Sequence, residues 1–321
     1  MALSAAVIIP ARNPGPRFQE VIQAVLEQSL DLAIISSLEV LVIDSGSTDG
    51  TLEYLRALND ERVHVHQIAP AEFGHGKTRN AGAEMTQGEA LVFLTHDALP
   101  ANQQWLNALV KPLVQNPKVA GVFGRHIAYP EADEPTREAL ERHFEGFKAQ
   151  PEVYLENPAL YAAEEGSRKF LHFFSNNNSA MRRSVWAQHP FADVDFAEDQ
   201  VWAKEIIEAG YVKAYAHEAV VYHSHQFSAF ERFQRSFDEA SAFRRYFDYR
   251  LCRGPRMFIK RVYQETAADR RTFKMNIANV MGHWLGTYSQ RLPTRMAQWC
   301  SWDKRLQRGL RSAHGIENSR Q

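Results

Sequence analysis

Two aspartates follow apolar runs that are typical of buried strands. Asp44 comes directly after Val40–Ile43, and Asp97 lies three residues beyond Leu91–Leu94. A carboxylate at the end of such a strand can accept the ring N–H of uracil or thymine. It can also bind a divalent cation, with help from diphosphate oxygens and another side chain. Both aspartates can instead cap a following helix, and their types and positions alone leave these readings open.

Two histidines, His223 and His225, follow a further apolar run, Ala219–Val221. Side chains two residues apart in a strand share one face, so the pair is expected to face the same ligand. Imidazole suits Mn²⁺ better than Mg²⁺. The pattern therefore predicts a metal-binding role, beside the simpler reading of two structural histidines.

Adjacent acids, Glu198 and Asp199, precede the apolar positions of a predicted helix. Acids at a helix start interact favourably with the helix dipole. An acid in this position can also act as the general base that deprotonates a hydroxyl nucleophile. Spacing does not decide between the two roles.

The elements that would position these residues alternate between strand and helix. Further strands are predicted at Ala6–Ile9, Val63–Ile68 and Val119–Phe123, with helices between them. Such alternation predicts an α/β fold with a mostly parallel sheet and helices on both faces. Ligands of these sheets bind at the carboxyl ends of the strands, where Asp44 and Asp97 fall.

A glycine-rich stretch, AEFGHGKT, opens the helix expected between Gly74 and Met85. It fits a relaxed phosphate-loop pattern, but Ala69–Glu72 lie between its glycines and the preceding strand, which carries two histidines. Lys77 and Arg79 at this helix start are suited to phosphate oxygens, or they are surface cations of a solvated turn. No GxGxxG motif supports a nicotinamide or flavin site.

Charge is distributed unevenly along the 321 residues. Residues 1–229 hold 18 Lys and Arg against 30 Asp and Glu, whereas residues 230–321 hold 19 against 8. A basic tail on an acidic body indicates contact with an anionic partner, or simple complementarity between the two parts. We expect two domains, residues 1–229 and a helical, basic region 230–321.

The chain has two cysteines, Cys252 and Cys300, too few for a disulfide framework. No apolar run reaches the roughly 20 residues that span a bilayer, and the start lacks a signal-peptide pattern. We expect a cytoplasmic protein, soluble or peripheral on a membrane.

Taken in order, seven stretches between Ala6 and Gln226 resemble the family 2 glycosyltransferases, whose fold is called GT-A. They are IIPARN, VLVIDSGSTDGT, FGHGKTRNAG, VFLTHDALP, SNNNSAMRRSVW, FAEDQVWAKEIIEAGY and AVVYHSH. FGHGKTRNAG, LTHDALP and the HSH ending look most like the bacterial rhamnosyltransferase branch. Members of that branch use dTDP-L-rhamnose to build cell-surface polysaccharide such as O-antigen.

The resemblance implies a role for each matching residue. Asp44 would read the pyrimidine base, and Asp199 of the Glu198–Asp199 pair would be the catalytic base. Asp97 would bind Mg²⁺ or Mn²⁺ together with His223 or His225. Thr95 replaces the first acid of the family's Asp-x-Asp motif, and this departure bears on metal affinity. The remaining expected substrate-binding residues are Pro10, Arg12, Asn13, Ser45, Gly76, Lys77, Arg79, His96, Asn177, Asn178 and Trp202.

The basic tail mixes arginines with aromatic residues, from Arg244 to Arg261, and resembles a membrane-surface helix. The inner-membrane surface on its cytoplasmic side and a polyprenyl-diphosphate-linked glycan acceptor would both fit it. A homodimer interface is an alternative. No nucleic-acid-binding module is visible.

The sequence thus predicts an inverting transferase that moves L-rhamnose from dTDP-L-rhamnose to a glycan hydroxyl. A UDP-hexose or UDP-N-acetylhexosamine transferase is the alternative within the family. Two further alternatives are a phosphate-loop nucleotide hydrolase and an inactive glycan-binding relative of the family.

Overall fold

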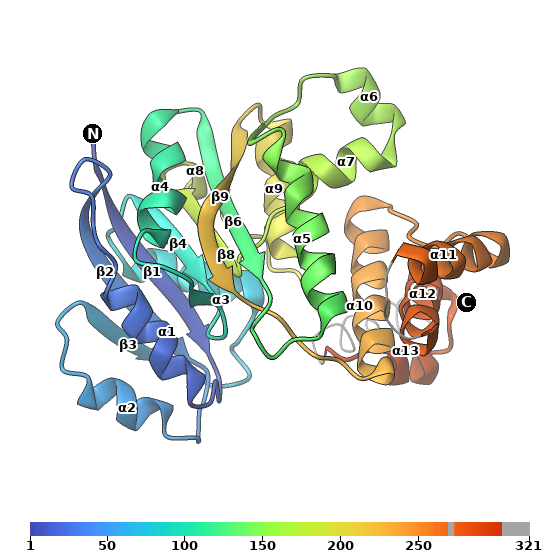
Figure 1. Ribbon diagram of the computed structural model, residues 1–321, viewed down its shortest axis with the longest axis horizontal. Helices are drawn as coiled ribbons and strands as arrows, with labels where there is room; N and C mark the ends of the chain where they lie inside the picture. Colours follow the sequence, from blue (N-terminus) through green and yellow to red (C-terminus); the bar gives the residue numbers. More distant parts are fainter. Residues whose placement is uncertain (269–272, 304–321) are drawn as a thin grey trace, which may run out of the picture. The chain divides into compact units, whose positions relative to one another are not determined.

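The computed structural model describes residues 1–268 and 273–303, so the end of the predicted basic region, residues 304–321, lies outside the described part (Figure 1). The chain divides into two compact units. The first comprises residues 1–131, 140–193 and 198–224. The second comprises residues 132–139, 194–197 and the chain from His225 onward.

A mixed sheet forms the centre of the first unit. Its nine strands in the described residues lie in the order β3-β2-β1-β4-β8-β6-β9-β5, with β7 also paired to β9. Their bounds are β1 Leu3–Ala11, β2 Ile35–Asp44, β3 Val63–Gln67, β4 Ala90–Leu94, β5 Leu99–Pro100, β6 Val119–Ile127, β7 Glu152–Val153, β8 Asn178–Arg182 and β9 Val212–Tyr222.

Six of these strands, β1, β2, β3, β4, β6 and β9, run parallel to one another, as the alternating pattern predicts. The exception at the centre is β8, which lies antiparallel between β4 and β6 and was not predicted. Pro100 lies in the two-residue strand β5 at the end of the sheet order, consistent with the exclusion of proline from central strands.

Helices cover both faces of this sheet. Alternate residues of β1 contribute to opposite apolar clusters: Val7 and Ile9 to one, Ala6 and Ile8 to the other. The first cluster includes residues of α1, α2 and α4, and the second includes residues of α3, α5, α7, α8 and α9. The bounds are α1 Arg17–Leu26, α2 Thr51–Ala57, α3 His75–Met85, α4 Trp105–Gln115, α5 Glu134–Lys148, α6 Pro158–Ala163, α7 Glu165–His172, α8 Arg183–Trp186 and α9 Glu198–Glu208. This two-sided burial explains why the central strands read as continuous apolar runs.

Trp202 fixes the distance between α9 and the sheet. The side chain is 1% exposed, and its Nε1 donates a hydrogen bond to the His189 carbonyl at 2.8 Å. A Cβ placed on Gly121 of β6 would lie 2.6 Å from the Trp202 ring. Only glycine therefore leaves room for the indole, and Trp202, expected from the resemblance to bind substrate, is a core residue.

The second unit is helical, as predicted for the basic region. Its main elements are α10 Ala229–Phe247, α11 Pro255–Ala268, α12 Phe273–Thr287, the 3₁₀ turn η1 Ser289–Arg291 and α13 Thr294–Cys300. Ser228 and Glu231 form a capping box that begins α10. Gly254 lies directly before α11, which begins at Pro255. Within the described ranges, none of the helices has the length and apolar character needed to cross a membrane.

Candidate active site

Asp44, the last residue of β2, is fully buried, and in the described part of the chain only one of its carboxylate oxygens has a hydrogen-bond partner. Its Oδ1 accepts hydrogen bonds from the backbone N–H groups of Gly46 at 3.0 Å and Ser47 at 2.9 Å. Its Oδ2 is buried without a partner among the described residues. A buried carboxylate oxygen normally has a hydrogen-bond donor, so this position is suited to a donor supplied by a ligand.

Asn13 shapes the turn that follows β1. Its backbone adopts a positive φ of 44°, which asparagine tolerates better than most residues. Its Oδ1 accepts from the Thr48 N–H at 2.7 Å, and its own N–H donates to Ser47 Oγ at 2.8 Å. The two loops after β1 and β2 are thereby joined, and the neighbouring Arg12 side chain is exposed.

Ser45 and His96 link the strand ends to one another. Ser45 donates from its N–H and its hydroxyl to the Ala11 carbonyl, at 3.0 and 3.1 Å. His96, in the turn after β4, has its Nδ1 3.3 Å from the carbonyl oxygen of Pro10. The expected nucleotide-binding residues on β1, β2 and the β4 turn therefore lie at one edge of the sheet.

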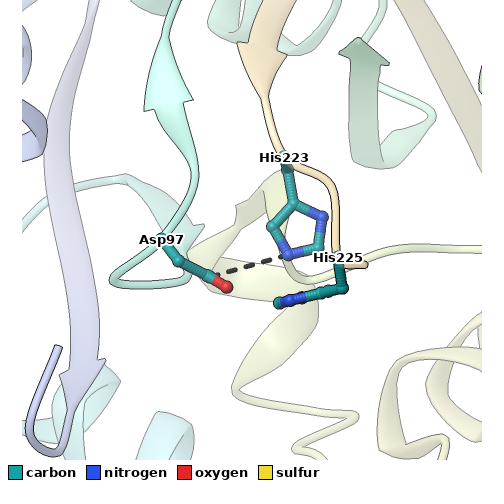
Figure 2. A group of neighbouring side chains, drawn as sticks. All are labelled: Asp97, His223 and His225. Carbon is teal, nitrogen blue, oxygen red and sulfur yellow. Dashed lines mark ion pairs between the residues drawn. The ribbon is translucent and has the colours of Figure 1, made fainter. Parts of the chain in front are cut away.

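Asp97 and His223 face each other beyond the ends of β4 and β9, with Oδ1 3.6 Å from Nε2 (Figure 2). His225 is two residues further along and begins the second unit. Each of the three residues offers a ligand atom within 4.8 Å of the other two. The histidines lie past the end of β9, in an irregular segment, so they do not share the strand face that their spacing suggested.

One carboxylate and two imidazoles form a donor set that suits Mn²⁺. A second observation comes from Thr95, where the family motif has its first acid. The Thr95 hydroxyl is buried and has no partner among the described residues. It is a neutral oxygen in the turn that carries Asp97. The residues present therefore fit a divalent cation, with one acid fewer than the full motif would supply.

His126 of β6 lies behind His223 and was not found from the sequence. The two rings meet edge to face with centroids 5.4 Å apart. Burial, and to a lesser extent the neighbouring His223, hold the pKa of His126 well below its usual value. A neutral ring thus supports one side of His223.

The acid pair begins α9, and Asn176 contacts both of its members. The Asn176 N–H donates to Asp199 Oδ2 at 3.1 Å, and its side-chain amide donates to Glu198 Oε1 at 3.2 Å. Asp199 Oδ1 accepts from the Gln200 N–H at 2.8 Å. Asn176 lies next to Asn177 and Asn178 in the sequence, and its two partners in the acid pair are 23 and 22 residues away.

The two acids have different proton affinities. Burial favours the neutral form of Glu198, but Arg79, His75 and Asn176 outweigh it and lower its pKa. For Asp199 removal from water is the larger cause, and the adjacent charge of Glu198 adds to it. Together they raise the pKa of Asp199 to about 7. A half-buried carboxylate with such a pKa is suited to accept a proton near neutral pH.

Arg79 is turned inward toward the acid pair. It is buried, and its Nη1 lies 3.0 Å from Glu198 Oε1 and 3.1 Å from the His75 carbonyl. Lys77, two residues earlier, is exposed. A Cβ on Gly76 would meet the Ala192 carbonyl oxygen at 2.5 Å, so the close backbone approach at this glycine is to the protein itself. Of this segment's expected phosphate contacts, Lys77 alone has an exposed side chain.

Asn178 belongs to the core. It is fully buried, its Oδ1 accepts from Trp105 Nε1 at 2.8 Å, and its Nδ2 donates to the Ala219 carbonyl at 2.8 Å. These contacts occupy the polar atoms of the Asn178 side chain, so it has none left to bind a substrate. Asn177 is half-buried, and its carbonyl lies 3.5 Å from the Thr95 N–H.

The backbone joins the parts of the site in one line. Asp44 is paired in register with Ala11, and Pro10 contacts His96. Thr95 meets Asn177, whose neighbour Asn176 holds Asp199. Asp44, the turn that carries Thr95 and Asp97, and Asp199 thus follow one another along the carboxyl edge of β2, β1 and β4.

Comparison with known proteins assigns the chain to a family. Residues 6–188 match the family described as glycosyl transferase family 2. The O-antigen chain rhamnosyltransferase RfbN of Salmonella typhimurium is 34% identical over 236 residues, which are 72% of this chain and 70% of RfbN. The O-antigen chain rhamnosyltransferase WbaN of Salmonella anatum is 32% identical over 243 residues, 73% of this chain and 70% of WbaN.

Solved structures agree on the fold. A mannosyltransferase of Pyrobaculum calidifontis in complex with GDP-Man and Mn²⁺ superposes with a TM-score of 0.56 at 16% identity, covering 99% of this chain and 76% of its own. S. aureus TarS 1–349 in complex with UDP gives 0.53 at 18% identity, covering 97% and 87%. Both the sheet and the relatives identify the GT-A fold predicted from the motifs, and the chain belongs to glycosyl transferase family 2 and is a glycosyltransferase.

Proposed function

We propose that the chain transfers L-rhamnose from dTDP-L-rhamnose to a hydroxyl of a glycan acceptor, in the synthesis of O-antigen-type polysaccharide. The names of the two relatives with 34% and 32% identity support the sugar and the pathway class. The line of contacts from Asp44 to Asp199 along one sheet edge is the observation that carries the proposal.

In this proposal Asp44 selects the donor's base. The N3–H group of thymine or uracil would donate to the unpartnered Oδ2, while Oδ1 keeps the turn at Gly46 and Ser47. Pro10, Arg12, Asn13 and Ser45 would line the nucleoside, and His96 and Lys77 the diphosphate. Cytosine presents an acceptor at N3 and would meet Oδ2 as a second acceptor.

Asp199 would accept the proton of the attacking acceptor hydroxyl. The hydroxyl oxygen forms the new bond to the anomeric carbon as the bond from that carbon to the diphosphate oxygen breaks. The departing oxygen takes the electron pair with it. A single displacement inverts the anomeric carbon, and no covalent enzyme intermediate is needed. Glu198, held by Arg79 and Asn176, would keep Asp199 in place and raise its basicity.

Asp97, His223 and His225 would hold a divalent cation, with Mn²⁺ fitting two imidazoles better than Mg²⁺. When bound, the cation neutralises charge on a departing nucleoside diphosphate. Tyr129 supports the turn, because its hydroxyl donates to the backbone carbonyl of Asp97 at 3.1 Å.

We propose that residues 1–229 carry out the chemistry and that the basic region 230–321 meets the acceptor at the cytoplasmic face of the inner membrane. Exposed side chains on α11 support this, because Ile259 and Tyr263 are 68% and 75% exposed beside Arg256 and Lys260. Such a mixture is typical of helices that lie on anionic membranes. A dimer interface is the alternative use of the same surface.

The test is a transfer assay with a panel of donors: dTDP-rhamnose, UDP-glucose, UDP-galactose and UDP-N-acetylglucosamine. Each is supplied with Mn²⁺, with Mg²⁺ and with chelator, over lipid-linked acceptors from O-antigen-producing bacteria. We expect turnover with dTDP-rhamnose and an inverted linkage by NMR. Turnover with a UDP-sugar alone would retain the family and discard rhamnose. Donor binding without turnover on any acceptor would favour an inactive glycan-binding relative.

A further inference from the structure

A pocket of about 250 Å³ in the second unit is lined by three arginines. The lining residues are Arg244, Arg250, Thr287, Tyr288, Gln290 and Arg291. They come from the last turn of α10, the loop after it, the end of α12 and η1. No carboxylate is among the lining residues, so the wall carries a concentrated positive charge.

Interaction with helix ends explains the positions of only two of the three arginines. Arg244 lies in the last turn of α10 and Arg291 in the last turn of η1, where cations interact favourably with the exposed carbonyl ends. Arg250 belongs to no helix, since α10 ends at Phe247 and α11 begins at Pro255. A third guanidinium converging from a loop has no such helix-end explanation.

The packing of α10 against α12 holds the pocket in shape. A Cβ on Gly286 would lie 2.4 Å from the Phe237 carbonyl oxygen, so the two backbones are in close contact. Ser241 Oγ and Ser289 Oγ are hydrogen-bonded at 2.8 Å, one turn before Arg244 and two residues before Arg291. The backbone positions of Arg244 and Arg291 are thus fixed relative to each other.

The hydroxyls in the wall already serve the protein. Thr287 Oγ1 donates to the His283 carbonyl at 2.7 Å, and the Tyr288 hydroxyl donates to the Arg253 carbonyl at 2.6 Å. The exposed donor-bearing side chains of the wall are those of Arg250, Gln290 and Arg291. Arg244 also pairs with Asp248, whose side chain is 76% exposed and whose attraction is consequently screened by water.

We propose that this pocket binds a phosphate or diphosphate group. Three guanidiniums match the several oxygens and multiple charge of phosphate, which arginine contacts in a bidentate manner. The volume is below the roughly 300 Å³ at which pockets for whole small molecules begin, so it suits a charged group and not an entire nucleotide sugar. The inference stands on the second unit alone and does not rest on the proposed function.

The experiment compares two full-length double variants that each remove two charges. R250Q/R291Q changes the pocket, and K274Q/R295Q changes an exposed lysine of α12 and an exposed arginine of α13 that do not line it. Sodium pyrophosphate is titrated calorimetrically into each protein and the wild type, with chelator present so that the Asp97 site is not loaded. We expect affinity to fall about tenfold or more in the pocket pair and about twofold or less in the matched pair.

Vesicle sedimentation then identifies the source of the group. The vesicles contain phosphatidylcholine alone, phosphatidylcholine with phosphatidylglycerol, or phosphatidylcholine with undecaprenyl diphosphate. Loss confined to the pocket pair on phosphatidylglycerol indicates a headgroup, and loss on undecaprenyl diphosphate indicates a lipid-linked diphosphate. Pyrophosphate binding with no vesicle binding indicates a soluble phosphate. Equal loss in the two pairs, or no pyrophosphate binding by the wild type, overturns the proposal.

Discussion

Arg79 and Glu198 form an ion pair inside the first unit, with Nη1 3.0 Å from Oε1 and side chains only 5% and 7% exposed. The pair connects α3 to the start of α9 and so to the neighbouring Asp199. Because both charges are removed from water, each depends on the other for its stability.

Arg79→Ala should therefore lower stability by roughly 3–5 kcal/mol, because it leaves the Glu198 carboxylate buried without its cation. Lys77→Ala in the same helix is the control, since an exposed lysine should change stability by no more than about 0.5 kcal/mol. Urea unfolding followed by circular dichroism measures both. If the two variants unfold at the same urea concentration, the ion pair has no structural role.

Asp199→Asn should reduce turnover by at least roughly a hundredfold while donor binding stays unchanged, because an amide cannot accept the hydroxyl proton. Glu205→Gln makes the same chemical change in the same helix at a half-exposed position and should retain near-normal turnover. Steady-state kinetics and donor titration separate the effects. Near-normal activity of Asp199→Asn would remove the base assignment.

The pH dependence of kcat/KM should follow the ionisation of Asp199, whose pKa is raised to about 7. The base works only when deprotonated, so the rate should fall tenfold per pH unit below about pH 7. Glu198 raises this pKa, whereas Arg79 and the N–H groups of Asn176 and Gln200 lower it.

Glu198→Gln removes the adjacent negative charge and should move this acid limb to lower pH, measured on protein shown to remain folded. The raised pKa of Asp199 also makes the stability of the folded protein depend on pH. A raised pKa in the folded state stabilises the protonated form, and this contribution disappears as pH rises through 7. An acid limb that stays in place in Glu198→Gln would assign it to another group.

Asp97→Ala should abolish measurable Mn²⁺ binding in the presence of nucleoside diphosphate and reduce turnover by at least roughly a hundredfold. His223→Ala should weaken Mn²⁺ binding, since its Nε2 lies 3.6 Å from Asp97 Oδ1. His64→Ala, on the exposed side of β3, is the matched histidine control. Electron paramagnetic resonance of Mn²⁺ reports binding directly. Unchanged spectra in Asp97→Ala would place the cation elsewhere.

Asp44→Asn should change the preference for the base. Its oxygen can keep the bonds to Gly46 and Ser47, but the second position becomes an NH₂ donor. Binding of UDP and dTDP should weaken by about tenfold or more, and binding of CDP should improve, because cytosine carries an acceptor at N3. Asp49→Asn in the same loop is the exposed control. A uniform loss for all three nucleotides would argue against base reading.

The sequence predicted the parallel frame well, because strands such as β2 and β4 contain the apolar runs Val40–Ile43 and Leu91–Leu94, which are followed by polar turns. It missed β8, whose start at Asn178 and Ser179 is polar although both residues are fully buried. Asn178 is satisfied by Trp105 and Ala219, partners 73 and 41 residues away in the chain. Such partners leave no trace in local periodicity.

The same limit applies to the site. Residues at strand ends were predicted, because topology alone brings them to one edge. The inward direction of Arg79 was not, since its partner Glu198 lies 119 residues away. Its position at a helix start gave the same signal as the exposed Lys77. Asn176 was likewise indistinguishable from its two neighbours.

The contact between Gly121 and Trp202 has a consequence for natural variation. A Cβ at position 121 would approach the indole to 2.6 Å, so neither residue can change freely while the other remains. Homologues with alanine or serine at 121 should carry a smaller side chain at 202, and the two positions should therefore vary together. Since α9 also begins with Glu198 and Asp199, an exchange at positions 121 and 202 should also change the distance of the acid pair from the sheet.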